Sequence, residues 1–209
     1  MKIYVGIGNA NNNRLAICAE LGLGLMITSP SKVSPSYKSL SCALDNGGFT
    51  CNKKGYPFMK KPFLDTLYNA YNAGVTLDFI VCPDVLSGGL RSLDVSMQWA
   101  NGELYSASNL ALVVQDGMVE ADIERAFNNT SNISHLFVGG SPEWKWKTVE
   151  DWANLAKKHS LKIHVGQVGT LERLEYCEHI CVDSVDSTSW SRNNTWHILE
   201  EYKRKSRLF

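Results

Sequence analysis

Short apolar runs alternate with amphipathic stretches along almost the whole chain. The apolar runs are rich in Val, Ile and Leu, and they cover residues 2–7, 23–28, 41–44, 76–82, 110–114, 135–138, 161–165 and 180–182. Runs of this kind, without polar alternation, are typical of parallel strands buried on both faces. Helical periodicity lies between them, over residues 13–21, 62–73, 90–101, 119–128, 148–159, 171–177 and 194–205.

This strand–helix alternation predicts the α/β class and, more specifically, a compact (β/α)8 TIM barrel. We expect residues 1–209 to form one catalytic barrel domain with short connections, because 209 residues is close to the lower limit for this fold. A doubly wound open sheet is the alternative architecture, and the number of strands favours the barrel.

The composition fits a soluble globular protein, with 44% hydrophobic and 20% charged residues. The formal net charge is zero, so any nucleic-acid binding must use a local basic patch. Lys53-Lys54, Lys60-Lys61 and Lys203-Arg204-Lys205 are candidates, and a solvated face explains such short runs equally well. No apolar run approaches the ~20 residues that span a bilayer, and no secretory signal begins the chain. We therefore expect a cytoplasmic protein with reduced cysteines and no membrane partner.

Two sequence patterns raise the question of a metal or a cofactor. Cys177, His179 and Cys181 are close in sequence, but no second ligand pair has zinc-finger spacing, so no metal site is expected. Gly6-Ile7-Gly8 resembles the start of a dinucleotide fingerprint, yet Asn11 stands where the third glycine belongs. We expect no cofactor.

Polar residues and glycines follow most of the predicted strands, where a barrel places its active site. They are Asp45, Asp84, Gln115, Asp116, Gly139, Gly140, Gly166, Gln167, Asp183 and Asp186, and the seventh strand itself carries His164. An ordinary hairpin turn at Asp45 and helix N-caps elsewhere are the alternative explanations. If these side chains share one pocket, an Asp and a Gln can bind the edge of a purine-like base, and Phe49 can stack on its face.

The order of these motifs resembles the tRNA-guanine transglycosylase superfamily over about residues 40 to 190. The matching segments are Asp45-Asn46-Gly47-Gly48-Phe49, Asp84, Val113-Val114-Gln115-Asp116-Gly117, Gly139-Gly140, Val168-Gly169-Thr170 and Val182-Asp183-Ser184. That superfamily has a (β/α)8 fold and exchanges guanine in nucleic acid for a 7-deazaguanine without breaking the backbone.

The resemblance implies a role for each matching residue. Asp183 is the expected nucleophile at the sugar C1′, with Asp186 as the competing candidate, and Asp45 is the expected general acid/base. Base recognition is expected from Asp84, Gln115, Gly139, Gly140, Phe49 and His164.

The chain departs from the tRNA enzymes because it has no match to their CxCxxC…H zinc pattern. It is more similar to small relatives that place 7-deazaguanines in phage or bacterial DNA. We therefore expect a base-exchanging pentosyltransferase that acts on DNA in preference to tRNA, uses a free 7-deazaguanine base and flips its target base. A protein partner that helps to hold the DNA is a further expectation. A hydrolytic DNA glycosylase and a non-catalytic nucleic-acid-binding subunit are the alternatives.

Overall fold

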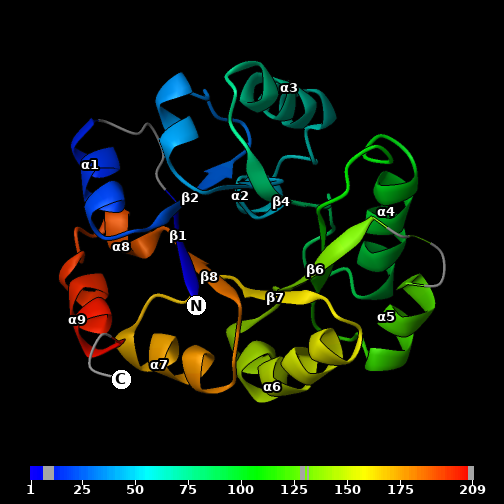
Figure 1. Cartoon of the computed structure of the whole chain (residues 1–209). Helices are drawn as coiled ribbons and strands as arrows, with labels where there is room; N and C mark the ends of the chain where they lie inside the picture. Colours follow the sequence, from blue (N-terminus) through cyan, green and yellow to red (C-terminus); the bar gives the residue numbers. More distant parts are fainter. Residues whose placement is uncertain (7–11, 128–129, 131, 207–209) are drawn as a thin grey trace.

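The computed structural model describes residues 1–6, 12–127, 130 and 132–206, and its parallel strands close into one barrel in sequence order (Figure 1). This confirms the predicted (β/α)8 TIM barrel. The strands are β1 (Lys2–Gly6), β2 (Gly24–Thr28), β3 (Cys42–Asp45), β4 (Leu77–Val81), β5 (Leu110–Val114), β6 (Ile133–Val138), β7 (Lys162–Val165) and β8 (Ser184–Ser187).

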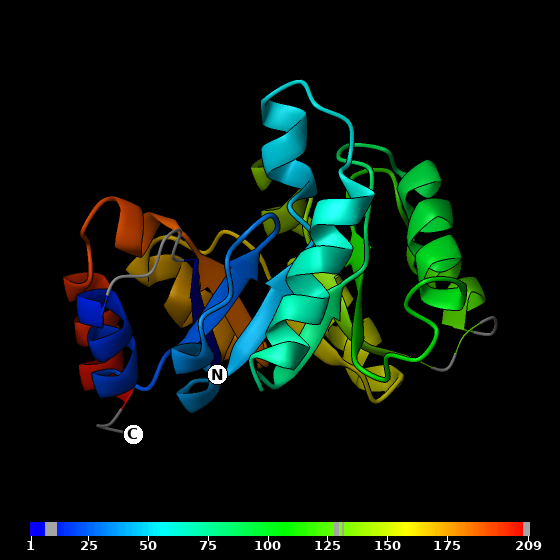
Figure 2. The ribbon, with the colours of Figure 1, turned by 90° about the horizontal axis from the view of Figure 1, so that it is seen from above.

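Helices surround the barrel, as the view along it shows (Figure 1). They are α1 (Asn12–Glu20), the 3-10 helix η1 (Pro35–Ser39), α2 (Gly48–Lys53), α3 (Lys60–Asn72), α4 (Leu90–Asn101), α5 (Glu120–Phe127), α6 (Pro142–Lys158), α7 (Leu171–His179), α8 (Ser189–Arg192) and α9 (His197–Ser206). Figure 2 shows that the short helix α2, in cyan, stands above the barrel. No helix in the described part of the chain is long and apolar enough to cross a membrane.

Two layers of apolar side chains hold the barrel together. A large cluster fills the space between strands and helices, and β5 is buried at every position. A smaller cluster fills the barrel interior and consists of Tyr4, Met26, Ala43, Phe79, Val81, Ala111 and Val113. Near the N-terminal ends of the strands, the Tyr4 hydroxyl donates to Asp78 at 2.7 Å. The barrel interior is therefore packed with side chains at this level.

The predicted eighth strand is wrong. As a result, the candidate catalytic residue Asp183 precedes the observed strand instead of following it. We predicted a strand over residues 180–182, but α7 continues to His179 and Val182 is a buried loop residue in the outer core. The observed strand β8 has the sequence Ser-Val-Asp-Ser. A polar strand inside a barrel carries no run of apolar residues, so the hydrophobic pattern could not reveal it.

Three helical regions also differ from the prediction. Helix α6 begins at Pro142 rather than at residue 148, because Ser141 caps it by accepting from the Trp144 N–H at 3.3 Å. The predicted helix over 194–205 is observed as α9, which begins only at His197, and the short helix α8 before it was not predicted. Helix α2 was not predicted either. The predicted ends at residues 7 and 128, and residues 7, 8 and 11 of the discounted dinucleotide motif, lie outside the described residues.

Gly47 controls the turn from β3 into α2, and we expect Gly47→Ala to destabilise the fold by about 3 kcal/mol. Its φ is 79°, and a Cβ at this position would collide with the carbonyl oxygen of Ser29. Gly55→Ala is the matched control, because Gly55 also has a positive φ, 71°, but a Cβ there meets no atom within 4 Å. Gly55→Ala should lower the free energy of unfolding by about 1 kcal/mol, because only backbone strain is added. Urea unfolding of both variants measures the difference, and equal losses would contradict the collision.

Candidate functional site

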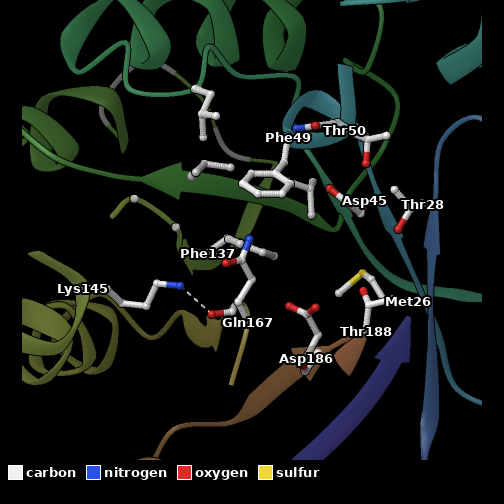
Figure 3. Close-up of a pocket in the computed structure, with 18 of the residues that line it drawn as sticks. Met26, Thr28, Asp45, Phe49, Thr50, Phe137, Lys145, Gln167, Asp186 and Thr188 are labelled. Atoms are coloured by element: carbon white, nitrogen blue, oxygen red, sulfur yellow. Dashed lines mark hydrogen bonds between the residues drawn. The ribbon is translucent and has the colours of Figure 1, made fainter. Parts of the chain in front are cut away.

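A pocket of about 520 Å³ opens at the carboxyl ends of the barrel strands (Figure 3). Strands β2 to β8 and the loops that follow them supply its floor and walls, and Phe49, Thr50 and Lys53 of α2 form one side. Of the predicted site residues, those that line this pocket are Asp45, Phe49, Asp84, Gln115, Gly139 and Gly140. The structure thus places these six predicted residues in one pocket.

Asp45 ends β3, and its carboxyl group points into the pocket (Figure 3). The turn that Gly47 permits brings the Gly47 N–H to 3.4 Å from Asp45 Oδ1. Burial, followed by the negative charge of Asp186, raises the pKa of Asp45 to about 7, although the Gly47 hydrogen bond opposes the rise. A carboxyl group with this pKa can both give and take a proton near neutral pH.

Asn46 holds Asp84 in place. The Asn46 side chain is 4% exposed, and its Nδ2 donates to Cys82 O and to Asp84 Oδ1, both at 2.8 Å. Its Oδ1 accepts from the Gly48 N–H at 2.6 Å, so all the polar atoms of this amide are used. Burial raises the pKa of Asp84, and the hydrogen bond from Asn46 opposes that rise. Asn46 was not predicted as a site residue. An Asn directly after a strand-end acid often bonds the backbone of a turn through its side chain, and this position could have indicated its role.

Gln115 presents a buried acceptor without a protein partner. Its Nε2 donates to Ser92 Oγ at 2.5 Å, to Val85 O at 3.0 Å and to Asp84 Oδ2 at 3.4 Å. Its Oε1 is buried and has no hydrogen-bond partner among the described residues. An orphaned buried acceptor costs about 1–3 kcal/mol, so a donor from a ligand would stabilise this site.

Asp186 lies on β8 and points into the pocket opposite Asp45 (Figure 3). Its Oδ1 is 3.1 Å from Nε2 of His164, and Nδ1 of the same ring is 2.9 Å from Ser184 Oγ. His164 is fully buried and packs against the Phe79 and Phe137 rings, at centroid distances of 4.9 and 4.7 Å. His164 does not line the pocket, so it orients Asp186 from below.

Asp183 lies elsewhere, because it precedes β8 and stands at the N-terminal end of the barrel. Its Oδ2 accepts from the Ile163 N–H and its carbonyl oxygen accepts from the Lys2 N–H, both at 2.8 Å. It does not line the pocket. The expectation that Asp183 follows the eighth strand was therefore wrong. Asp186, which the sequence left as the competing candidate, occupies the mouth.

The sequence itself explains why Asp183 was chosen over Asp186. Val182-Asp183-Ser184 is followed directly by Val185-Asp186-Ser187, so the same tripeptide occurs twice. A shift of three residues along a strand is about 10 Å. That shift carries an aspartate from one end of a four-residue strand to the other.

Four cationic side chains of the described residues line the pocket, and most of them were not predicted from the sequence. Lys53 of α2, Arg173 of α7 and Arg192 of α8 reach it from three helices, and Lys145 reaches it from the first turn of α6. Lys145 was missed because the predicted helix began at residue 148, and the Ser141-Pro142 start signal was the clue that could have found it.

The described residues contain no group of three or more His, Cys, Asp or Glu side chains that could hold a metal ion. Cys177 is buried in the outer core, whereas Cys181 is exposed. The polar side chains that line the pocket include carboxyl groups, amides and cations. Comparison of the sequence with protein-family models, and with curated proteins, finds no match.

Proposed function

We propose that this protein exchanges a guanine-type base at an N-glycosidic bond of nucleic acid, through a covalent intermediate on Asp186. The observation that carries the proposal is that Asp45 and Asp186 share the pocket and that the pKa of Asp45 is raised to about 7. Two carboxyl groups with different environments are the usual means of dividing nucleophilic and acid–base work.

The polar wall of the pocket fits a base with neighbouring N–H donors. Gln115 Oε1 is an unpaired acceptor, and the adjacent Asp84 carboxyl group offers further acceptor capacity. Guanine and 7-deazaguanine carry donors at N1 and at the 2-amino group, side by side, whereas adenine has a single donor group on that edge. The wall therefore favours a guanine-type base. Phe49, which is 50% exposed at the rim, is available to stack on it.

In the proposed reaction, a carboxylate oxygen of Asp186 attacks C1′ while the bond from C1′ to the base breaks. Asp45 gives its proton to the departing base and becomes a carboxylate. An entering base then attacks C1′, loses its proton to Asp45, and releases the Asp186 carboxylate. The two displacements balance in atoms and charge, and no water is consumed.

A nucleic-acid substrate is consistent with the cations that line the pocket. They make this part of the surface locally positive, although the net charge of the chain is zero. Lys53, Arg173 and Arg192 line the pocket and can attract backbone phosphates. The target base must leave its stack to reach the strand ends. DNA remains our preferred substrate over tRNA, on the resemblance to the small DNA-modifying enzymes.

Labelled guanine tests the proposal without knowledge of the natural entering base. We expect the full chain to place labelled guanine in DNA that already contains guanine, without strand breaks. Duplex DNA, single-stranded DNA and tRNA serve as parallel substrates. Alkali-labile sites formed without an added base would instead indicate a hydrolytic glycosylase. Binding without exchange or base release on any substrate would indicate a non-catalytic module and overturn the proposal.

A further inference from the structure

Acidic and basic residues are unevenly distributed along the chain, although their numbers balance overall. Residues 21–64 contain six lysines and one acidic residue, Asp45, whose side chain lines the pocket. This segment supplies β2, β3, α2 and the start of α3, which form one sector of the barrel. The sector is therefore rich in positive charge, and a partner with negative charge is favoured there.

Ion pairs occupy some of these lysines and leave others available. Lys60 and Lys61, at the start of α3, each pair with a carboxylate group. Lys53 and Lys54, at the end of α2, are exposed and form no ion pair among the residues that the structure describes. Lys53 lines the pocket, and Lys54 lies next to it in the chain but outside the pocket lining. These two cations are therefore free to bind an anionic partner beside the pocket.

Tyr56 is an exposed aromatic residue that the backbone fixes close to these lysines. Gly55 follows α2 with a φ of 71°, and its N–H donates to Asn52 O at 2.9 Å. The Tyr56 N–H donates to Cys51 O, also at 2.9 Å. These two bonds form a Schellman motif, in which the residue after the glycine often packs back against the helix. Tyr56 is nevertheless 59% exposed, so its ring is available for stacking.

Both ends of this segment are anchored to the rest of the protein. Before it, Cys51 of α2 is only 5% exposed. After it, the Phe58 ring packs against the rings of Phe63 and Trp99, at centroid distances of 5.8 and 5.7 Å. Figure 2 shows that α2 itself stands above the barrel. The exposed side chains are thus presented on a preformed surface, which loses little conformational entropy when a ligand binds.

We propose that residues 52–57, the α2 arm, bind the nucleic-acid strand next to the target nucleotide. Lys53 and Lys54 contact its phosphates, and Tyr56 stacks on an unpaired base. Cations combined with an exposed aromatic ring are the usual means of binding a single strand without reading its sequence. When the target base leaves the stack, the neighbouring bases expose a face for such stacking. This inference rests on the base exchange proposed above and goes beyond it by naming the surface that holds the substrate.

The test measures binding of a fluorescent single-stranded DNA to the full chain by anisotropy, over a series of salt concentrations. For Lys53→Met/Lys54→Met we expect roughly 10-fold weaker binding at low salt. The slope of affinity against salt should also fall by about 1.4, because each phosphate contact of a single strand contributes about 0.7. Tyr56→Ala should weaken binding by about 10-fold with the wild-type slope, because stacking releases no counterions. Tyr56→Phe should bind as the wild type does, because the ring remains.

The matched controls lie at the other end of the barrel. Lys157→Met/Lys162→Met makes the same charge change at exposed positions, in the last turn of α6 and at the start of β7. Tyr105→Ala removes a tyrosine that is 75% exposed. Both controls should bind the DNA as the wild type does, and thermal melting verifies that every variant is folded. Equal weakening by the two lysine pairs, or a wild-type slope in Lys53→Met/Lys54→Met, would overturn the inference.

Incorporation of labelled guanine separates this inference from the proposed function. Exchange by the wild type, with unchanged DNA affinity in the α2 arm variants, would overturn the binding surface alone. DNA binding that depends on the α2 arm, without exchange or base release by the wild type, would overturn the proposed function alone. Absence of binding to single-stranded DNA, duplex DNA and tRNA would overturn both.

Discussion

The Asp186→Asn variant is expected to lose base exchange by roughly 10³- to 10⁴-fold, because an amide cannot replace the carboxylate as the nucleophile at C1′. Asparagine has the same shape and can still hydrogen-bond His164, so the fold should be retained. The measurement is incorporation of labelled guanine into DNA. A second readout is the protein–DNA adduct on a denaturing gel when no entering base is supplied. The wild type should form this adduct and Asp186→Asn should not.

Asp183→Asn is the matched control. It changes the other aspartate of the repeated tripeptide, and an amide oxygen can still accept from the Ile163 N–H that Asp183 binds. We expect wild-type exchange and a normal adduct from this variant. Loss of the adduct in Asp183→Asn, with its retention in Asp186→Asn, would contradict the nucleophile assignment.

The second large effect concerns Asp45, whose replacement by Asn should slow exchange by about 10²- to 10⁴-fold. Release of the first base requires protonated Asp45, whereas attack by the second requires its carboxylate. Because its pKa is about 7, the first half-reaction should slow above pH 7 and the second below it. Single-turnover rates for each half-reaction, measured from pH 5 to 9, test these opposite dependences. Both half-reactions having the same pH profile would contradict the assignment.

The same residue should make stability depend on pH. The folded-state pKa of Asp45 is raised to about 7 from an ordinary value of 3.8, so the neutral form is the one that the fold favours. Its stabilising contribution is complete below about pH 4 and is lost as the pH rises through 7. Asp45→Asn should therefore be more stable than the wild type at pH 8 by on the order of 1–2 kcal/mol, and much less so at pH 4. Urea unfolding at the two values measures this change.

Asp186 contributes to the raised pKa of Asp45 through its negative charge. Asp186→Asn should therefore lower the pKa of Asp45, which NMR titration of the carboxyl carbon can follow. The Asp186 and Asp45 variants are therefore related, because the charge of Asp186 affects the proton affinity of Asp45. An unchanged Asp45 titration would show that the charge of Asp186 does not contribute to the raised pKa, which would then be due to burial and Asp84.

Much of the barrel could be predicted because buried parallel strands carry a direct hydrophobic signal. β5 is apolar and buried at every position, and the predicted range 110–114 is the observed one. Asp45, Asp84 and Gln115 could be placed for the same reason: each follows such a strand, and all strand ends of a parallel barrel meet at one face.

Prediction failed where the local pattern was ambiguous or polar. β8 contains two serines and an aspartate, so its limits could not be inferred from apolar residues. The repeated Val-Asp-Ser tripeptide then offered two equivalent aspartates. The pairing of β8 with β7 and with β1, which aligns Ser184 with His164 and Asp186 with Tyr4, decides that Asp186 points into the mouth and Asp183 lies at the other end.

The sequence by itself thus determined the barrel, the face that carries the site and most of its polar wall, because these follow from the periodicity of single strands. The tertiary structure decided which aspartate faces Asp45, that His164 orients it, and that Lys145 reaches the pocket from α6. Those features depend on strand register and on contacts between elements far apart in the chain, and no local pattern encodes either.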